Sequence, residues 1–227
     1  LNDDSIKIIT LEDPVEYQLE GINQIQVNHD IGFDFSKGLR SIVRQDPDVI
    51  MVGEIRDSET AQIGMQSALT GHLVFSTLHT NDAPSAYTRL LDLGLDEYLL
   101  NAALISIVAQ RLVRKICNEC AYEYADKKVV EDFNLEDIAQ KFNDKKISLR
   151  KGKGCKQCNH TGYYGRLAIV EYLRCDDSIE KLPKGAEFVL GARELMAKNN
   201  IRSLHNDGLL KVIKGLTTLE EVVRVAG

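Results

Sequence analysis

An acid that directly follows an apolar strand pattern is the first candidate for chemistry in this sequence. Residues 48–52 read DVIMV behind Pro47, a short β-branched run that predicts a strand buried in a parallel sheet. Gly53 and Glu54 end this run. Ligands of open α/β sheets bind beyond the carboxyl ends of the strands, where a carboxylate can hold Mg²⁺ or orient a water for attack on a nucleotide phosphate. Glu54 is therefore the first candidate catalytic residue, and the alternative is a solvated acid or a helix cap.

A second apolar run ends in acids in the same way. Residues 7–11, KIITL, are followed at once by Glu12, Asp13 and Pro14. Because parallel strands end at one edge of their sheet, we expect Glu12 and Asp13 to lie around the same ligand as Glu54. The alternative is that both acids belong to a turn that Pro14 enforces.

Two histidines bracket residues 73–78, which predict another buried strand. His72 precedes this run and His79 follows it closely. An imidazole donates hydrogen bonds and titrates near neutrality, so these rings are candidates for sensing a phosphate or carrying a signal from a nucleotide to a subunit interface. The alternative is that both are ordinary packing residues.

Arg40 and Arg44 lie four positions apart near the end of a predicted helix over residues 35–43, and so on one helix face. A guanidinium group matches phosphate oxygens in a bidentate way, which makes this pair a candidate clamp on a phosphate, including one held by a neighbouring subunit. The alternative is surface pairing with a nearby acid, Asp46, Asp48 or Asp57.

Four of the five cysteines form two CxxC pairs, which indicate a metal site in a reducing compartment. Four thiolates in such pairs suit tetrahedral Zn²⁺, and His160 is a spare ligand. The separation of the pairs is longer than in a typical zinc ribbon, which we explain by an inserted helix over residues 129–142. Cys175 is predicted to be a small buried apolar residue. The four predicted ligands are Cys117, Cys120, Cys155 and Cys158.

The remaining periodic segments predict helices and two further strands. Residues 96–110 predict a strongly apolar helix of the core, to which we assign no chemistry. Residues 165–173 predict a strand that returns to the main body, and the threonines before the last helix predict capping boxes. The other predicted elements are a half-exposed strand over residues 22–27 and helices over 58–71, capped by Ser58, 82–94, 187–199, 204–214 and 219–225.

Composition narrows the class of protein. With 227 residues, 44% of them apolar and 27% charged, the chain can bury a core as a globular protein. Its net charge of -6 argues against a general nucleic-acid binder. No apolar run approaches the ~20 residues that span a bilayer, and no secretory signal pattern occurs. We expect a protein of the cytoplasm or of a membrane surface.

A basic stretch begins between the cysteine pairs and runs into the second pair. The plain interpretation is a solvated loop. The sharper interpretation is a contact with anionic lipid headgroups or with a partner protein. The stretch comprises Lys141, Lys145, Lys146, Arg150, Lys151, Lys153 and Lys156.

Four sequence blocks in this order closely resemble the secretion ATPase superfamily, and within it the assembly ATPases of bacterial type II secretion and type IV pili. Each block alone is weak, but the ordered set spans nearly the whole chain. The blocks are ITLEDPVEY at residues 9–17, LRSIVRQDPDVIMVGEIRD at 39–57, TGHLVFSTLHTND at 70–82, and the paired CxxC followed by TGYYGR at 161–166.

The resemblance implies a role for each candidate residue. Glu12 and Asp13 match the family's Asp box, and Gly53 and Glu54 end its Walker B strand, with Glu54 acting on Mg²⁺ and the attacking water. The resemblance further implies a cytoplasmic homo-hexamer at the inner membrane, which uses ATP hydrolysis to move a membrane platform that assembles pilins or pseudopilins. It places His72 and His79 in the His box, Arg40, Arg44 and Arg56 among arginines that reach the nucleotide between subunits, and the four cysteines in a zinc element.

One expected motif does not occur. The sequence contains no GxxxxGK[ST] loop, whose backbone amides and lysine cradle the phosphates in this family. We therefore interpret the chain as a carboxy-terminal part of such an ATPase that binds ATP poorly by itself. The predicted fold class is α/β, a partial RecA-like core over residues 1–112, with an inserted tetracysteine zinc module over 113–164 and a returning strand with a helical module over 165–227.

Two other classes of function remain open at this point. One is a nucleic-acid-dependent RecA-like ATPase or helicase with a zinc ribbon, against which the acidic net charge and the lack of aromatic residues in the basic stretch argue. The other is a zinc-bound scaffold without turnover. The sequence does not choose between type II secretion and pilus assembly.

Overall fold

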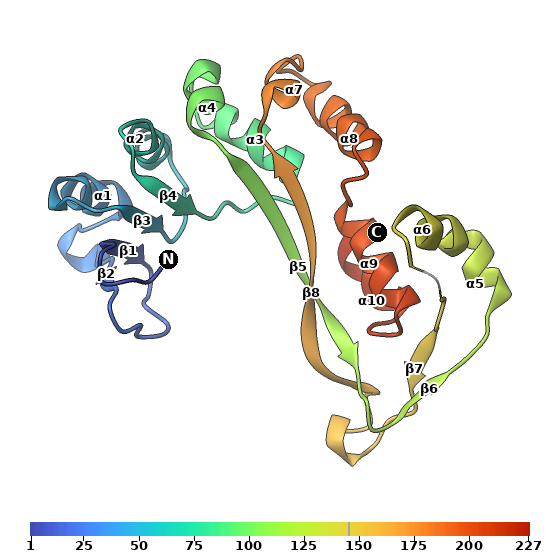
Figure 1. Ribbon diagram of the computed structural model, residues 1–227. Helices are drawn as coiled ribbons and strands as arrows, with labels where there is room; N and C mark the ends of the chain where they lie inside the picture. Colours follow the sequence, from blue (N-terminus) through green and yellow to red (C-terminus); the bar gives the residue numbers. More distant parts are fainter. Residues whose placement is uncertain (145) are drawn as a thin grey trace. The chain divides into compact units, whose positions relative to one another are not determined.

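The computed structural model describes residues 1–144 and 146–227, and the chain divides into two compact units (Figure 1). Unit 1 comprises residues 1–81, 85–105 and 175–181, and unit 2 comprises 82–84, 106–174 and 182–227. Lys145 of the basic stretch lies outside the described residues. The division predicted at residues 112 and 164 concerns functional parts and stays a prediction. None of the described helices is long and apolar enough to cross a membrane.

Unit 1 contains a four-stranded, all-parallel sheet in the order β2-β1-β3-β4. The strands β1 and β3 lie in its middle and are mostly buried, as their apolar runs predict. β4 was predicted to be buried as well, but it is an edge strand among those described, and Phe75 is 46% exposed. The bounds are β1 Ile8–Glu12, β2 Asn23–Gln26, β3 Val49–Val52 and β4 Leu73–Ser76.

The helix α1 packs on the central strands because its apolar residues recur at helical spacing. Its buried Leu39 and Ile42 share one core cluster with Leu11, Ile50 and Val52. Figure 1 shows α1 and α2 along the same sheet. The bounds in unit 1 are α1 Phe35–Ile42, α2 Ser58–Leu69, α3 Ala83–Asp92, whose first two residues belong to unit 2, α4 Glu97–Ala103 and α7 Asp177–Glu180.

The cap of α2 differs by one residue from the prediction. Asp57, rather than Ser58, is the N-cap, and its carboxylate accepts a hydrogen bond from Thr60 N at 2.8 Å. An aspartate with extended backbone geometry satisfies an amide that has no partner inside the helix. The helix therefore begins directly after Arg56, which keeps the segment after β3 short.

The predicted apolar helix over residues 96–110 was wrong in its second half. The helix α4 ends at Ala103, and the strand β5, Ser106–Ile116, follows. The β-branched Ile107, Val108 and Val113 favour a strand, and pairing with β8, Tyr163–Arg174, decides the outcome. Val108 is 61% exposed, so this part of the segment is not core either.

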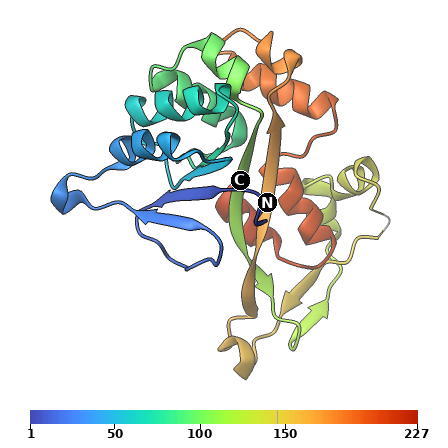
Figure 2. The ribbon, with the colours of Figure 1, turned by 60° about the vertical axis from the view of Figure 1, so that its left-hand side comes forward.

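Unit 2 is built on the antiparallel ribbon of β5 and β8 (Figures 1 and 2). The strand predicted over residues 165–173 is confirmed, but it pairs with β5 and not with the parallel sheet. Val113, Ile169 and Leu204 form a buried cluster, and both views show α9 and α10 along the ribbon. The helices of this part are α8 Phe188–Lys198, α9 Leu204–Ile213 and α10 Leu219–Ala226.

Carboxylates from α9 and α10 bind backbone amides of the ribbon. Asp207 Oδ2 accepts from Val170 N at 2.8 Å, and Glu221 Oε2 accepts from Arg114 N at 2.9 Å. The predicted capping box of α10 is wrong, because the N-cap Thr218 makes no capping bond and its hydroxyl lies 2.8 Å from that of Tyr163. These contacts fix the helices to the ribbon through polar as well as apolar groups.

The segment between the cysteine pairs contains two short helices instead of the one predicted over 129–142. They are α5, Lys127–Asp132, and α6, Leu135–Lys141, and Asn134 between them has a left-handed φ of 47°. A hairpin of β6, Ala121–Glu123, and β7, Arg150–Gly152, leads to and from them. Part of the basic stretch is engaged within unit 2, since Lys151 Nζ lies 2.9 Å from Glu220 Oε1.

Candidate nucleotide site and metal centre

The carboxyl ends of β1 and β3 bring two acidic segments together. Leu11 pairs with Val52 in parallel register, and Gly53 N donates to Leu11 O at 2.8 Å. A Cβ atom added at Gly53 would lie 3.1 Å from Leu11 O and 3.5 Å from Glu12 Cα. Glycine therefore allows the backbone beside Glu54 to approach the backbone of Glu12 closely.

Glu54 is held as a carboxylate at this edge. Its side chain is 13% exposed, Oε1 accepts from Arg56 Nη2 at 2.6 Å, and Oε2 lies 3.0 Å from His79 Nε2. The hydrogen bond from Arg56 is the largest influence, and with His79 it holds the pKa of Glu54 below its ordinary value although burial acts the other way. An ionised carboxylate can accept a proton from water or bind a hard cation.

The acids after β1 have partners of their own. Glu12 Oε1 accepts hydrogen bonds from the hydroxyl of Thr10 and from Gln24 Nε2, the latter at 3.0 Å. Asp13 Oδ2 lies 3.1 Å from His29 Nε2. The pKa of Arg56 is raised, first by its bond to Glu54 and further by the charge of Asp13. Arg56 therefore senses acids from both strand ends.

The segment after β4 is tied to the segment after β3 by its backbone as well as by His79. Thr77 Oγ1 donates to Gly53 O at 2.6 Å, and Ile55 N donates to Thr77 O at 3.0 Å. Sequence reasoning did not assign a role to Thr77. The signal that could have found it is its place just past the end of a strand parallel to β3.

The two predicted histidines do not meet. His79 follows β4 and reaches Glu54, whereas His72 precedes β4 and so lies at the opposite edge of the parallel sheet. His72 Nδ1 lies 2.9 Å from Ser67 O and 3.2 Å from Thr70 Oγ1, at the end of α2. Its placement is that of a residue closing a helix end.

The predicted arginines also separate. Arg56 contacts Glu54, while Arg40 forms an ion pair with Glu59 in the first turn of α2. Arg44 lies in the 3₁₀ turn Val43–Gln45, where its side chain is exposed, and no ion pair involves it within residues 1–144 and 146–227. Arg40 and Arg44 therefore do not act on Glu54 within this chain.

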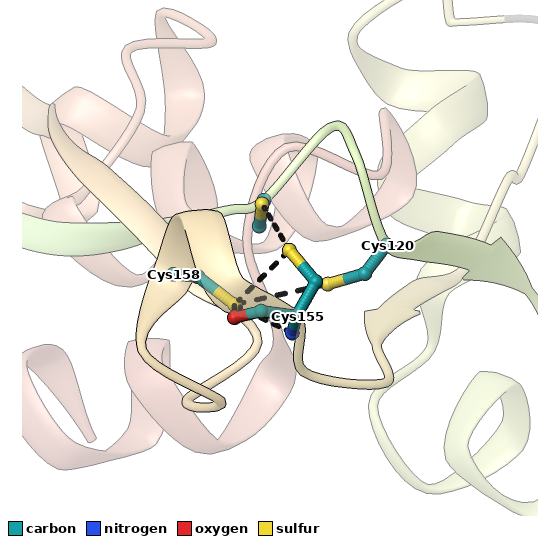
Figure 3. A group of neighbouring side chains, drawn as sticks. Cys120, Cys155 and Cys158 are labelled. Carbon is teal, nitrogen blue, oxygen red and sulfur yellow. Dashed lines mark hydrogen bonds between the residues drawn. The ribbon is translucent and has the colours of Figure 1, made fainter.

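The four predicted cysteine ligands gather at one point of unit 2 (Figure 3). Their sulfur atoms all lie within 4.8 Å of one another, and the distances between neighbouring sulfurs include 3.7, 3.8 and 3.9 Å. Sulfurs placed ~2.3 Å from a zinc ion at the corners of a tetrahedron are about 3.8 Å apart. The geometry fits a tetrahedral ion and is far too long for a disulfide. The group is Cys117, Cys120, Cys155 and Cys158, without His160.

The thiols influence one another strongly. Burial, the largest influence, raises the pKa of Cys120 to about 11. Burial also acts on Cys158, but amide donors from Cys155 and Gly162 outweigh it and lower the pKa of that thiol to about 6. Several thiolates in one place repel each other, and a divalent cation removes that conflict.

Comparison with known proteins decides the family. A model described as "Type II/IV secretion system protein" matches residues 1–224. The chain belongs to this family. It is 49% identical to the type II secretion system protein E of Xanthomonas campestris pv. campestris over 99% of this chain, and 46% identical to the type IV pilus assembly ATPase PilB of Thermus thermophilus over 94% of it. The resemblance drawn from the four sequence blocks is thereby confirmed.

Solved structures of secretion and pilus motors share the fold of this type II/IV secretion system protein. The pilus retraction motor PilT with bound ADP superposes with a TM-score of 0.66 and 26% identity over 97% of this chain and 52% of that one. The DotB ATPase of Legionella pneumophila gives the same TM-score at 21% identity, which shows the fold alone. The chain spans 39% of the Xanthomonas protein and 24% of PilB.

Proposed function

We propose that this chain supplies the acidic half of the ATP-hydrolysing centre of a motor that drives type II secretion or type IV pilus assembly. The observation that carries the proposal is the ionised Glu54, mostly buried at the carboxyl edge of a parallel sheet and held by Arg56 and His79. Membership of the type II/IV secretion system protein family supports it. The RecA-like character of unit 1 belongs to the same proposal.

Each residue at the edge has a distinct role in this proposal. Glu54 orients the attacking water and accepts its proton, and Arg56 and His79 keep its carboxylate in place until the nucleotide arrives. Glu12 and Asp13 offer further hard oxygen atoms, which suit Mg²⁺. When bound, Mg²⁺ neutralises charge on the phosphates.

The phosphates themselves need a cradle that residues 1–227 do not contain. The sequence has no GxxxxGK[ST] loop, and this loop provides most of the amide and lysine contacts to a triphosphate in such sites. We propose that another part of the longer protein supplies it, so that residues 1–227 alone bind ATP weakly and do not turn it over. Calorimetry with ATP on residues 1–227 and on the longer protein tests this part.

Further elements of the proposal concern assembly. Arg40 and Arg44 are exposed and do not reach Glu54 in their own chain, which suits contacts to the nucleotide of a neighbouring subunit in a homo-hexamer. The four cysteines hold a structural zinc ion. The motor acts on a membrane platform at the cytoplasmic face of the inner membrane, with anionic lipid as a further contact and no nucleic acid.

Replacement of Glu54 by glutamine in the longer protein tests the proposed function. Glutamine keeps the size of the side chain but cannot take a proton from water. ATP turnover must therefore fall while ATP binding persists. If turnover instead depends on added DNA and not on Glu54, the nucleic-acid-dependent reading replaces the motor.

A further inference from the structure

A buried carboxylate outside the nucleotide edge binds the first residues of two helices. Glu171, on β8, is 5% exposed. Its Oε1 accepts from Ala83 N at 2.8 Å and its Oε2 accepts from Leu204 N at 3.1 Å. Ala83 is the first residue of α3 and Leu204 is the first residue of α9.

These two contacts have a clear physical basis. The first amides of a helix have no partner inside the helix and carry part of its positive dipole, so a carboxylate is their strongest acceptor. Each oxygen of Glu171 serves one helix, and removal of the side chain leaves two amides in a buried place without these acceptors. Glu171 therefore holds the start of α3 to the start of α9.

The start of α3 is an isolated piece of unit 2. Residues 82–84 belong to unit 2, while the chain before and after them, 1–81 and 85–105, belongs to unit 1. Asp82 forms an ion pair with Arg193 on α8, also in unit 2. Glu171 and Arg193 together fix residues 82–84 from one side of the chain division.

The same loop is fixed to the nucleotide edge at its other end. Thr77 bonds to the backbone on both sides of Glu54, and His79 bonds to the Glu54 carboxylate itself. Only Thr80 and Asn81 separate His79 from the segment that Glu171 and Arg193 hold. A short loop with both ends bonded transmits a displacement from one end to the other.

We propose that Glu171 is a positioning residue for hydrolysis: by anchoring residues 82–84, it keeps the loop over residues 77–81 in the geometry that presents His79 to Glu54. This inference rests on the proposed function. It assigns the start of α9 to the same linkage, so that movement of the loop reaches α9 through one carboxylate.

The test uses the longer ATP-hydrolysing protein with Glu171→Ala, Glu171→Gln and a matched control, Asp207→Asn. Asp207 is also a buried carboxylate of unit 2 that accepts a backbone amide, but it has no bond to residues 77–84 among the described contacts. The measurements are kcat and KM for ATP, and amide hydrogen exchange over residues 77–86 and 204–208.

Glu171→Ala is expected to lower kcat about tenfold or more with KM changed less than twofold, because misplacement of a positioned group affects the chemical step. Exchange is expected to rise at the starts of both helices and also over residues 77–81. Glu171→Gln, whose amide oxygen still accepts one hydrogen bond, is expected to lie between wild type and alanine. Asp207→Asn is expected to leave kcat and the exchange of residues 77–81 unchanged.

The inference is overturned if exchange rises only at residues 83 and 204 while residues 77–81 stay protected, or if Glu171→Gln and Asp207→Asn have equal kcat. Glu171→Gln decides the question should the alanine variant fail to fold. The failure of the proposed function looks different: Glu54→Gln then keeps full turnover, and the exchange data alone still decide whether Glu171 fixes the loop.

Discussion

His79 Nε2 lies 3.0 Å from Glu54 Oε2, although the two residues are 25 positions apart in the sequence. The contact exists because α2 returns the chain to a strand parallel to β3, which brings both strand ends to one edge. It leaves the carboxylate ionised, oriented and bonded on both oxygens together with Arg56. The predictions below test what this arrangement does and what maintains it.

A methyl group at Gly53 is expected to disturb the edge. In Gly53→Ala the added Cβ would lie 3.1 Å from Leu11 O, so the ends of β1 and β3 must move apart by a few tenths of an ångström. We expect kcat of the longer protein to fall about tenfold or more, since small displacements of catalytic groups are costly. Steady-state ATPase kinetics measure this.

Gly64→Ala is the matched control for that substitution. Gly64 lies within α2, and a Cβ atom there has no neighbour within 4 Å. Alanine is a better helix former, so this variant should unfold at a free energy up to about 1 kcal/mol higher, with unchanged kcat. Equal ATPase rates in the Gly53 and Gly64 variants would refute the tight-edge explanation.

Glu221 is expected to make stability depend on pH in the acid range. Burial acts to raise its pKa, but hydrogen bonds from Arg114 and Arg224 lower it to about 2 from an ordinary value of 4.5. A lowered folded-state pKa stabilises the fold above the unfolded value, and this contribution disappears as the pH falls from about 4.5 to about 2. The full contribution is on the order of 3 kcal/mol.

Denaturant unfolding of wild type and Glu221→Gln measures this linkage on residues 1–227. The difference in unfolding free energy should be largest above pH 5 and should shrink as the pH falls toward 3. Glu131→Gln, an exposed acid on α5, should show no such trend. A difference that is constant from pH 7 to pH 3 would mean that Glu221 acts through packing and not through its charge.

The cysteine group is expected to bind about one zinc ion per chain. Elemental analysis of the purified protein measures the content, and a chelator should destabilise unit 2. Replacing Cys120 or Cys155 by serine should lower the unfolding free energy by several kcal/mol, as loss of a structural metal does. Cys175→Ser, outside the group, is the control. Metal-free protein of undiminished stability would refute a structural zinc site.

Arg44 is expected to act across a subunit boundary. Arg44→Ala should lower ATP turnover of the oligomer while leaving the unfolding free energy of residues 1–227 within about 0.5 kcal/mol, because the side chain is exposed. Mixing Arg44→Ala with Glu54→Gln subunits should restore some turnover, since one interface then combines an intact arginine with an intact glutamate. No recovery in any mixing ratio would place Arg44 outside the nucleotide site.

The parallel sheet and its acidic edge were predictable, while the partners of the acids were not. The runs ending at Val52 and Leu11 report buried strands by their own composition, and parallel strands end together. The error over residues 96–110 arose because an apolar segment does not reveal its period when its pairing partner, β8, lies far along the chain. Strand direction, which separates His72 from His79, was not used.

Long-range polar contacts escaped sequence reasoning for a different reason. Glu171 binds Ala83 across 88 positions, and nothing near either residue marks the other. The cysteine group was predictable because its two pairs carry their own chemical signature. Sequence patterns thus located the groups that do chemistry, and the structure was needed for the contacts that hold them.

Single-turnover hydrolysis of ATP by Glu54→Gln tests the central claim most directly. The longer protein is saturated with ATP, binding is measured separately, and Glu131→Gln serves as the carboxyl-to-amide control. Removal of a positioned general base typically lowers the rate about 10²- to 10⁴-fold, so we expect a loss of that size with ATP affinity and oligomeric state unchanged. Hydrolysis at the rate of the Glu131→Gln control, with ATP fully bound, would contradict the role of Glu54 and with it the proposed motor site.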